Sequence, residues 1–241
     1  MNNREYLKYK NWNKDNFGYI NKNDKKKFSS ELKRINRKLY PGMKILEIGF
    51  GNGKFLKYAT SNNYDVVGLE TNELLVKIAI ENGYNCYSAD QLEKFLPQSF
   101  DLIVAFSVLE HISQESFLSY LRSLNNLLKI DGRLLALFPN GDSPLGLPNQ
   151  NGDVTHLNFI GRGKINYISD NLDMKIIYLG GESQPIFGVG LKLSIYRAIT
   201  MPIKFILDYI LNLLFSPSNK INYLSSNLVV VLGSGKKDDQ D

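Results

Sequence analysis

Residues 45 to 56, with the sequence ILEIGFGNGKFL, place three glycines and one carboxylate between two apolar runs. Gly49, Gly51 and Gly53 follow an expected buried strand and open an expected helix. Glycine suits such a position because the backbone has to turn sharply and because a Cβ would collide with an approaching ligand. The spacing G-x-G-x-G departs from the dinucleotide fingerprint G-x-G-x-x-G. The stretch therefore predicts a ligand-binding turn between a strand and a helix of an α/β fold.

Acidic side chains lie at the ends of three successive expected strands. Glu47 precedes the first glycine by two residues, where its charge would repel a pyrophosphate but would suit an ammonium or sulfonium group. Glu70 follows Gly51 by nineteen residues, a position from which an acid can accept both hydroxyls of a ribose. Asp90 ends the third strand and can accept a hydrogen bond from an exocyclic amine such as that of adenine. These acids predict a site for a positively charged nucleoside.

Short apolar runs and helical segments alternate along most of the chain. The expected strands are 44–50, 65–71, 85–90, 101–107, 133–139, 174–180 and 227–233. Helices are expected at 28–39, 72–82 and 115–130, where apolar residues recur at helical spacing. Alternation of this kind predicts a parallel sheet that helices cover on both faces.

These residues together resemble the class I S-adenosylmethionine-dependent methyltransferases over roughly residues 44–180, with the last strand near 227. The segment FDLIVAFSVLEHI, residues 100–112, is similar to the fourth motif of that family, and LEHI is one of its signatures. The resemblance implies an α/β, Rossmann-like sheet of seven strands in the order 3-2-1-4-5-7-6, with strand seven antiparallel. It also implies S-adenosyl-L-methionine as the cofactor and S-adenosyl-L-homocysteine as its product. The cofactor-binding residues that it implies are Glu47, Gly49, Phe50, Gly51, Gly53, Glu70, Thr71, Asp90, Gln91, Phe106 and Ser107.

A second stretch, FPNGDSPLGLPNQNGDVTHLNFIG at residues 138–161, carries a closer resemblance. It is similar to methyltransferases from bacterial surface-polysaccharide clusters, which serve lipopolysaccharide O-antigen or capsule, and the matching residues include Asp153, Thr155 and His156. This resemblance implies O-methylation of a sugar hydroxyl. The implied acceptor is a glycan or another small molecule, which can be lipid-linked.

Methyl transfer to a hydroxyl requires removal of a proton, and a general base adds about 10²–10⁴-fold to the rate. Histidine is the usual base, and the chain has two, His111 and His156. We expect His156 to be the base, with Asp153 orienting its ring or holding it charged, and His111 to be the second candidate. Asp142, Asp153 and His156 are an alternative set of ligands for a divalent ion, but their spacing is not diagnostic and we expect no metal.

The acceptor can be narrowed by what the chain lacks. The Asn/Asp-Pro-Pro-Tyr/Phe element of base-methylating and glutamine-methylating enzymes is absent after strand four, and the single cysteine, Cys86, opens strand three. We therefore expect no nucleic-acid substrate and no internal disulfide. Two alternatives to the sugar remain open. One is an isoprenoid quinone or other lipid-like molecule, and the other is a cofactor-binding, membrane-associated partner protein without turnover.

The charge of the chain is unevenly distributed. Residues 1–40 hold twelve Lys and Arg against four Asp and Glu, whereas the whole chain has 29 against 24. The high pI therefore does not by itself indicate a nucleic-acid binder. Trp12, Phe17 and Tyr19 of this arm either close over the cofactor or anchor the arm to the domain. The expected parts are a basic N-terminal arm and helix that cap the site at 1–40, a methyltransferase domain at 41–235 with an amphipathic helical insertion at 181–227, and a disordered tail at 236–241.

Residues 191–215 of the insertion are very apolar, but four charged residues and one proline interrupt them. Because no run between these interruptions reaches bilayer length, we do not expect a membrane span. The faces of this segment predict an amphipathic helix that either covers the domain's own core or rests on a membrane. The start, MNNREYLKYK, lacks the apolar core of a signal peptide. We therefore expect a cytoplasmic protein that can attach peripherally to the inner membrane.

Overall fold

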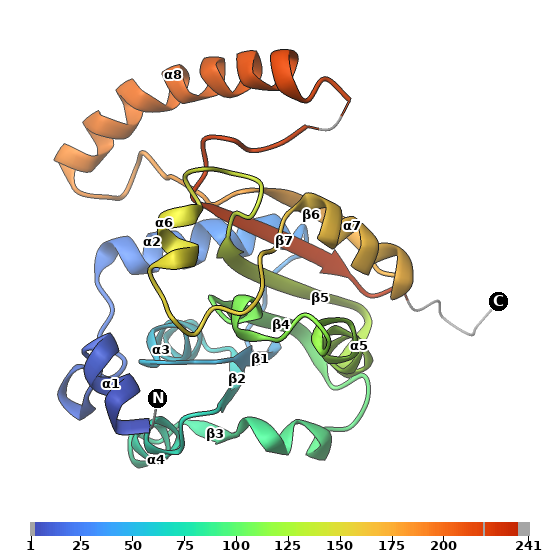
Figure 1. The fold of residues 1–241 in the computed structure, drawn as a ribbon. Helices are drawn as coiled ribbons and strands as arrows, with labels where there is room; N and C mark the ends of the chain where they lie inside the picture. Colours follow the sequence, from blue (N-terminus) through green and yellow to red (C-terminus); the bar gives the residue numbers. More distant parts are fainter. Residues whose placement is uncertain (1–2, 219, 236–241) are drawn as a thin grey trace.

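The computed structural model describes residues 3–218 and 220–235, and a seven-stranded sheet forms its centre (Figure 1). The strands are β1 (Lys44–Ile48), β2 (Asp65–Glu70), β3 (Asn85–Ser88), β4 (Phe100–Phe106), β5 (Leu128–Pro139), β6 (Lys175–Gly181) and β7 (Asn227–Gly233). Their order, β3-β2-β1-β4-β5-β7-β6, confirms the predicted order. Strands β1 to β5 pair in parallel, whereas β7 is antiparallel to both β5 and β6, as predicted. The tail predicted at 236–241 lies outside the described residues.

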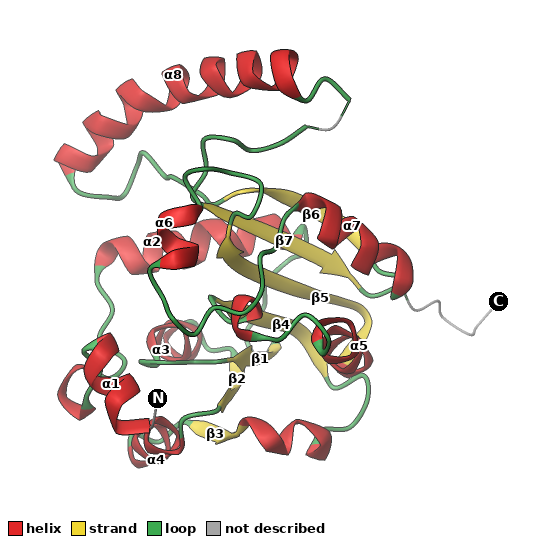
Figure 2. Ribbon diagram, in the orientation of Figure 1, coloured by secondary structure: helices red, strands yellow, loops and turns green. Residues whose placement is uncertain are grey.

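Helices cover both faces of this sheet, as predicted (Figure 2). The helices are α1 (Asn3–Lys10), α2 (Lys22–Leu32), α3 (Lys54–Ser61), α4 (Glu73–Glu81), α5 (Phe117–Leu127), α6 (Leu147–Asn151), α7 (Arg162–Asn171) and α8 (Leu191–Phe215). Neighbouring residues of a strand point to opposite faces, so β1 places Leu46 in a core with α5 and α7 and Ile45 in a core with α2, α3 and α4. Burial on both faces explains why the central strands read as nearly continuous apolar runs.

Several element boundaries differ from the prediction by a few residues, and those of α2, α5/β5 and β3 bear on the argument. Helix α2 starts before residue 28 because the side chain of Asn21 accepts hydrogen bonds from the first turn, and the following 3-10 turn stops at Asn36, whose φ is 50°. Strand β5 begins directly after α5, since Leu128 pairs with Phe100, so the predicted helix is too long at its end. Strand β3 stops at Ser88 rather than at residue 90.

The N-terminal arm lies against the glycine turn that follows β1. The ring of Trp12 is so near Gly51 that a Cβ there would come within 2.7 Å of it, and the ring of Phe17 would be 2.5 Å from a Cβ at Gly53. Trp12 also lines the large cavity described below, so it both anchors the arm and forms part of the cavity wall. Tyr19 is 69% exposed and takes part in neither.

Helix α8 lies apart from the sheet, at the top of Figure 1, and none of its residues is buried. The alternative in which this helix covers the domain's own core is therefore wrong. The helix has 25 residues, and an 18-residue window within it has a mean hydropathy of 1.6 with at most two charged residues. By length and composition the helix could cross a bilayer, so its charges and proline do not keep it below that length as expected.

Candidate functional site

A cavity of about 1100 Å³ lies at the carboxyl ends of β1, β2 and β4. This is the edge at which open α/β sheets bind ligands. Its walls come from the turns after these strands, from α1, and from the segment between β5 and α7. The predicted residues that line it are Glu47, Gly49, Phe50, Gly51, Glu70, Thr71, Phe106, Ser107, His111, Asp153 and His156.

The turn between β1 and α3 requires glycine at more than one position. Gly49 has a φ of +64°, and a Cβ there would lie 2.6 Å from Cγ2 of Val108. Gly51 has a φ of +51° and faces the ring of Trp12. Gly53 was expected to surround the cofactor, but it is covered by Phe17 and does not line the cavity. The missing side chains therefore make room for other protein side chains around the cavity, in addition to any ligand.

Glu70 ties the glycine turn to the turn after β2. Its Oε2 accepts a hydrogen bond from the backbone N–H of Gly51 at 2.9 Å, and its Oε1 accepts from the N–H groups of Thr71 at 2.8 Å and Asn72 at 3.0 Å. These bonds stabilise a charged carboxylate that is only 7% exposed. Its Oε2, with one partner, retains acceptor capacity toward a hydroxyl in the cavity.

Glu47 is also buried, but only one of its two oxygens has a partner. It is 4% exposed, and its Oε2 has no hydrogen-bond partner within residues 3–218 and 220–235. Burial first, and the nearby charge of Glu70 second, raise the pKa of Glu47 well above its ordinary value. Because Glu47 lines the cavity, a cationic group bound there would supply the missing partner.

The residues expected to contact adenine do not line the cavity, whereas the residues expected from the fourth motif do. Asp90 and Gln91 lie in a 3-10 helix after β3, and neither lines the cavity, although the neighbouring Ala89 does. Asp90 is exposed. Strand β3 ends at Ser88, so both residues belong to the 3-10 helix that follows the strand rather than to the strand end itself. Phe106 and Ser107 line the cavity as predicted.

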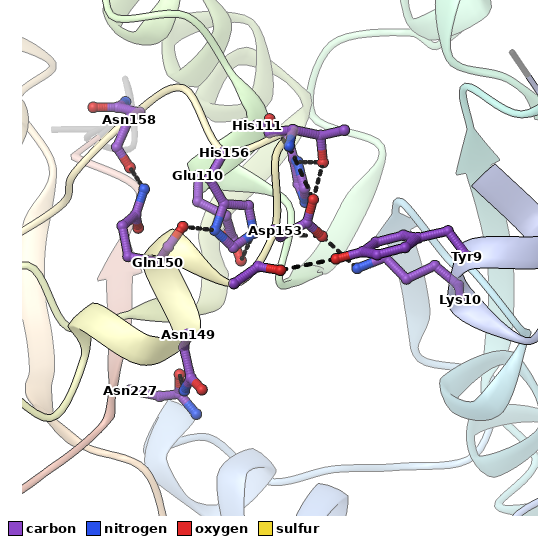
Figure 3. A network of polar contacts seen from close by, with 12 residues as sticks. Tyr9, Lys10, Glu110, His111, Asn149, Gln150, Asp153, His156, Asn158 and Asn227 are labelled. Atoms are coloured by element: carbon purple, nitrogen blue, oxygen red, sulfur yellow. Dashed lines mark hydrogen bonds and ion pairs between the residues drawn. The ribbon is translucent and has the colours of Figure 1, made fainter. Parts of the chain in front are cut away.

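The two histidines both line the cavity and lie beside each other, although 45 positions separate them in the chain (Figure 3). His111 ends the 3-10 helix after β4, His156 follows α6, and their ring centroids are 4.7 Å apart. Nδ1 of His111 is 3.1 Å from the carbonyl oxygen of Thr155, and Nδ1 of His156 is 3.0 Å from that of Gln150. A carbonyl oxygen only accepts, so each Nδ1 donates its proton, and the neutral form of either ring carries its lone pair on Nε2. Burial lowers the pKa of His111, which favours this neutral form.

Asp153, which was expected to orient or charge His156, has other partners. Its carboxylate pairs with Nζ of Lys10 at 2.5 Å and accepts hydrogen bonds from the backbone N–H and the hydroxyl of Thr155. Burial by itself would raise the pKa of Asp153, but these hydrogen bonds outweigh it and hold the pKa well below its ordinary value. Oδ2 of Asp153 lies 3.9 Å from Nε2 of His156, so the ring is oriented by the carbonyl of Gln150 rather than by this acid.

Glu110 is a site residue that the sequence reasoning did not single out. It is 1% exposed, neither of its carboxylate oxygens has a hydrogen-bond partner in the described part of the chain, and its Oε1 is 3.9 Å from Nε2 of His156. Burial raises its pKa to about 8. Its backbone carbonyl accepts hydrogen bonds from Leu157 and Asn158, which joins the two histidine segments. The sequence feature that could have identified Glu110 as a site residue is its position inside the LEHI segment.

Comparisons with known proteins address the identity of this fold. A model of the methyltransferase domain family matches residues 20–173, which is more than half of the chain. The ubiquinone biosynthesis O-methyltransferase of Pseudomonas aeruginosa is 27% identical over 101 residues, which are 39% of this chain and 43% of that protein. The cyclopropane-fatty-acyl-phospholipid synthase of Escherichia coli is 34% identical over 112 residues, which are 44% of this chain and 29% of that protein. The match thus spans less than half of the length of either relative.

A solved structure of a SAM dependent methyltransferase from Archaeoglobus fulgidus has the same fold. The TM-score is 0.64 and the identity 17%, and the superposition covers 87% of this chain and 94% of the other. The family match over residues 20–173 includes the glycine turn, the buried acids Glu47 and Glu70, and the two histidines. The chain therefore belongs to the methyltransferase domain family, and its sheet has the class I, S-adenosylmethionine-dependent methyltransferase fold.

Proposed function

We propose that this chain transfers the methyl group of S-adenosylmethionine to a hydroxyl oxygen of a lipid-like acceptor. The observation that supports this most strongly is the pair of buried acids beside the glycine turn. Glu70 has its charge stabilised by backbone N–H groups and can still accept from a ribose hydroxyl. Glu47 has an unpaired oxygen that suits the cationic methionine part of the cofactor.

The acceptor hydroxyl would lie at the histidine end of the cavity. During transfer, the acceptor oxygen forms a bond to the methyl carbon while the carbon–sulfur bond breaks and its electron pair stays on sulfur. The hydroxyl proton moves to Nε2 of His156, or to that of His111 as the second candidate. In the neutral ring of either residue Nε2 has the lone pair that this step needs, since Nδ1 donates to a carbonyl oxygen. Alignment of donor and acceptor supplies much of the remaining rate.

Three observations support a lipid-like acceptor, such as an isoprenoid quinone, and attachment at a membrane. Helix α8 has large apolar side chains that are exposed, among them Phe205 at 72% and Leu214 at 65%. A second cavity of about 430 Å³ lies between α8 and the body, with Arg34 and Lys204 in its lining. The two relatives act, by their names, in ubiquinone biosynthesis and on fatty-acyl phospholipid. Peripheral contact with the inner membrane through α8 and the basic arm would bring such an acceptor to the cavity.

A sugar hydroxyl in bacterial surface polysaccharide, either O-antigen or capsule, is the second candidate. The observation that favours it is the GDVTH segment, residues 152–156, which resembles enzymes of such clusters and contributes Asp153 and His156 to the cavity wall. A lipid-linked glycan would satisfy this segment and α8 together. A cofactor-binding partner protein without turnover is the remaining, non-enzymatic alternative.

The test is to incubate the full chain with methyl-labelled S-adenosylmethionine and, separately, with total lipid extract and with a lipid-free glycan-precursor fraction. We expect label in a lipid product, identified by mass spectrometry. Label only in the glycan fraction would favour a sugar hydroxyl, the second candidate, as the acceptor. If no product is labelled but S-adenosylhomocysteine still binds in calorimetry, the result would favour the cofactor-binding partner protein without turnover.

The role of His156 is tested in the same assay. We expect His156→Ala to bind S-adenosylhomocysteine as the wild type does and to lose turnover by about 10²-fold or more. Glu73→Gln, at an exposed position in the first turn of α4, is the control and should keep full activity. Unchanged turnover in His156→Ala would reject His156 as the base.

A further inference from the structure

The geometry points to a divalent transition-metal site formed by Glu110, His111 and His156. One ligand atom of each residue lies within 4.8 Å of the ligand atoms of the other two. Nε2 of His156 and Oε1 of Glu110 are 3.9 Å apart. Ligands that bind one zinc ion tetrahedrally at about 2.0–2.2 Å are roughly 3.4 Å from each other. Side-chain movements on the order of an ångström would therefore bring all three atoms into coordination.

Both imidazoles are held in a tautomer that leaves Nε2 available to a metal. Their Nδ1–H groups donate to the carbonyl oxygens of Thr155 and Gln150, so in each neutral ring the lone pair is on Nε2. A hydrogen bond from the distal ring nitrogen to a carbonyl is the usual support of a metal-binding histidine, because it fixes the ring orientation and the tautomer.

The carboxylate supplies an independent observation. Glu110 is 1% exposed, and no residue of the described chain gives either of its oxygens a hydrogen bond. A buried carboxylate without partners is costly, and a bound cation removes that cost. The trio differs from the ligands considered for the sequence, because Asp142 instead accepts a hydrogen bond from the backbone N–H of Arg162 and does not line the cavity.

The ligand chemistry selects the ion. Two imidazole nitrogens and one carboxylate suit Zn²⁺, Co²⁺, Fe²⁺ or Mn²⁺ and are a poor match for Ca²⁺ or Mg²⁺, which prefer oxygen ligands. The other charges that face the site are those of Asp153 and Lys10, which pair with each other and nearly cancel. Three protein ligands leave coordination positions open to small oxygen ligands.

The site deepens the proposed function, and its catalytic role rests on that function. An ion beside the cofactor would bind the acceptor hydroxyl and lower its pKa. Nε2 of His156 cannot ligate the ion and accept a proton at the same time, so the base role proposed for His156 belongs to the metal-free protein. With the ion bound, the hydroxyl proton would pass to water in the cavity. Binding of the ion does not depend on the identity of the acceptor and can be measured without turnover.

The composition of the chain allows a decisive experiment. The chain has two histidines and one cysteine, so any imidazole coordination by the untagged protein arises at this cluster. We expect Zn²⁺, added to metal-free protein with ¹⁵N-labelled histidine, to shift both Nε2 resonances together and to saturate at one equivalent. Glu110→Gln should weaken zinc affinity about tenfold or more. Cys86→Ala, a change at a buried thiol outside the cluster, should leave the affinity unchanged.

Two results would overturn the inference. One is the absence of any change in the Nε2 resonances at excess Zn²⁺, and the other is an undiminished zinc affinity in both Glu110→Gln and His111→Gln. The second variant covers the case in which Glu110→Gln does not fold, which its thermal unfolding would show. Calorimetry with S-adenosylhomocysteine on the same samples separates the two proposals. If the protein binds the cofactor but not zinc, only the metal-site proposal is rejected. If it binds zinc but not the cofactor, the proposed function is rejected.

Discussion

The substitution Glu47→Gln removes a buried charge while it preserves the shape of the side chain, and we expect it to stabilise the free protein and to weaken cofactor binding. Glu47 is 4% exposed, and its Oε2 is unpaired in the described structure. Its pKa is raised by burial and by Glu70, so the carboxyl keeps its proton to a higher pH in the folded protein than in the unfolded chain.

The sign and size of the effect on stability follow from this difference in proton binding. The folded pKa lies above the ordinary value of 4.5, so between these two values the folded protein binds more protons than the unfolded chain, and its stability falls as the pH rises. Glutamine does not titrate. The free energy of unfolding of the variant should therefore exceed that of the wild type by a margin that starts near pH 4.5 and grows by at most about 1.4 kcal/mol per pH unit.

The effect on binding has the opposite sign. The ammonium group of the cofactor would give the ionised Glu47 a charge-assisted partner, and the wild type should release a proton as the cofactor binds. Loss of a hydrogen bond to a charged group costs about 1.5–3 kcal/mol. We therefore expect the affinity of Glu47→Gln for S-adenosylhomocysteine to be about 10- to 150-fold weaker.

Urea unfolding between pH 5 and 8, followed by the fluorescence of Trp12, measures the first effect, and calorimetry in two buffers of different ionisation enthalpy measures the second together with the released proton. Glu73→Gln removes an exposed carboxylate and should change neither stability nor affinity by more than about 0.5 kcal/mol. An identical pH dependence and an identical affinity in wild type and Glu47→Gln would refute the assignment of Glu47 as an unpaired acid at the cofactor.

Three further outcomes are expected. In urea unfolding, Gly51→Ala should lose about 1–3 kcal/mol more stability than the control Gly83→Ala. Both glycines have positive φ, but a Cβ at Gly51 would meet the ring of Trp12, whereas a Cβ at Gly83 would have no atom within 4 Å. Equal losses in the two variants would contradict the placement of the arm. Leu207→Asp should reduce flotation with anionic vesicles about tenfold or more, since one buried leucine contributes about 1.5–3 kcal/mol; no flotation of the wild type would remove the membrane proposal. Asp90→Asn should change the calorimetric affinity for S-adenosylhomocysteine by less than about 0.5 kcal/mol, because the side chain of Asp90 is exposed and outside the cavity lining. A tenfold loss of affinity would instead support the contact with adenine expected from the sequence.

Much of the sheet and the cofactor side of the cavity could be predicted because their signals are local. The central strands are buried on both faces, so they read as short apolar runs separated by helical periodicity. Glu47, the glycine turn and Glu70 belong to one strand–turn–helix–strand unit, and the hydrogen bond from Gly51 to Glu70 closes that unit. Spacing along the chain was therefore enough to predict that these residues meet.

The sequence did not predict the positions of side chains where those positions depend on strand pairing or on burial. Asp90, expected at the adenine, lies in the 3-10 helix after β3 and outside the cavity lining, because β3 ends at Ser88, and its contact with adenine stays a prediction. The amphipathic pattern of α8 was equally compatible with a core helix and a surface helix, and only the absence of buried residues along it distinguished them. Glu110 read as part of a family signature, whereas its importance comes from burial without partners.

The sequence by itself determined the alternation of strands and helices along the chain, the glycine turn and the acids on either side of it, because these features depend on local apolar patterns and on contacts between neighbours in one α/β unit. Only the tertiary structure decided that Glu110 and His111 lie beside His156. That meeting depends on hydrogen bonds from Leu157 and Asn158 to the backbone of Glu110, across more than forty intervening residues, and no local pattern records which loop will close on which strand end.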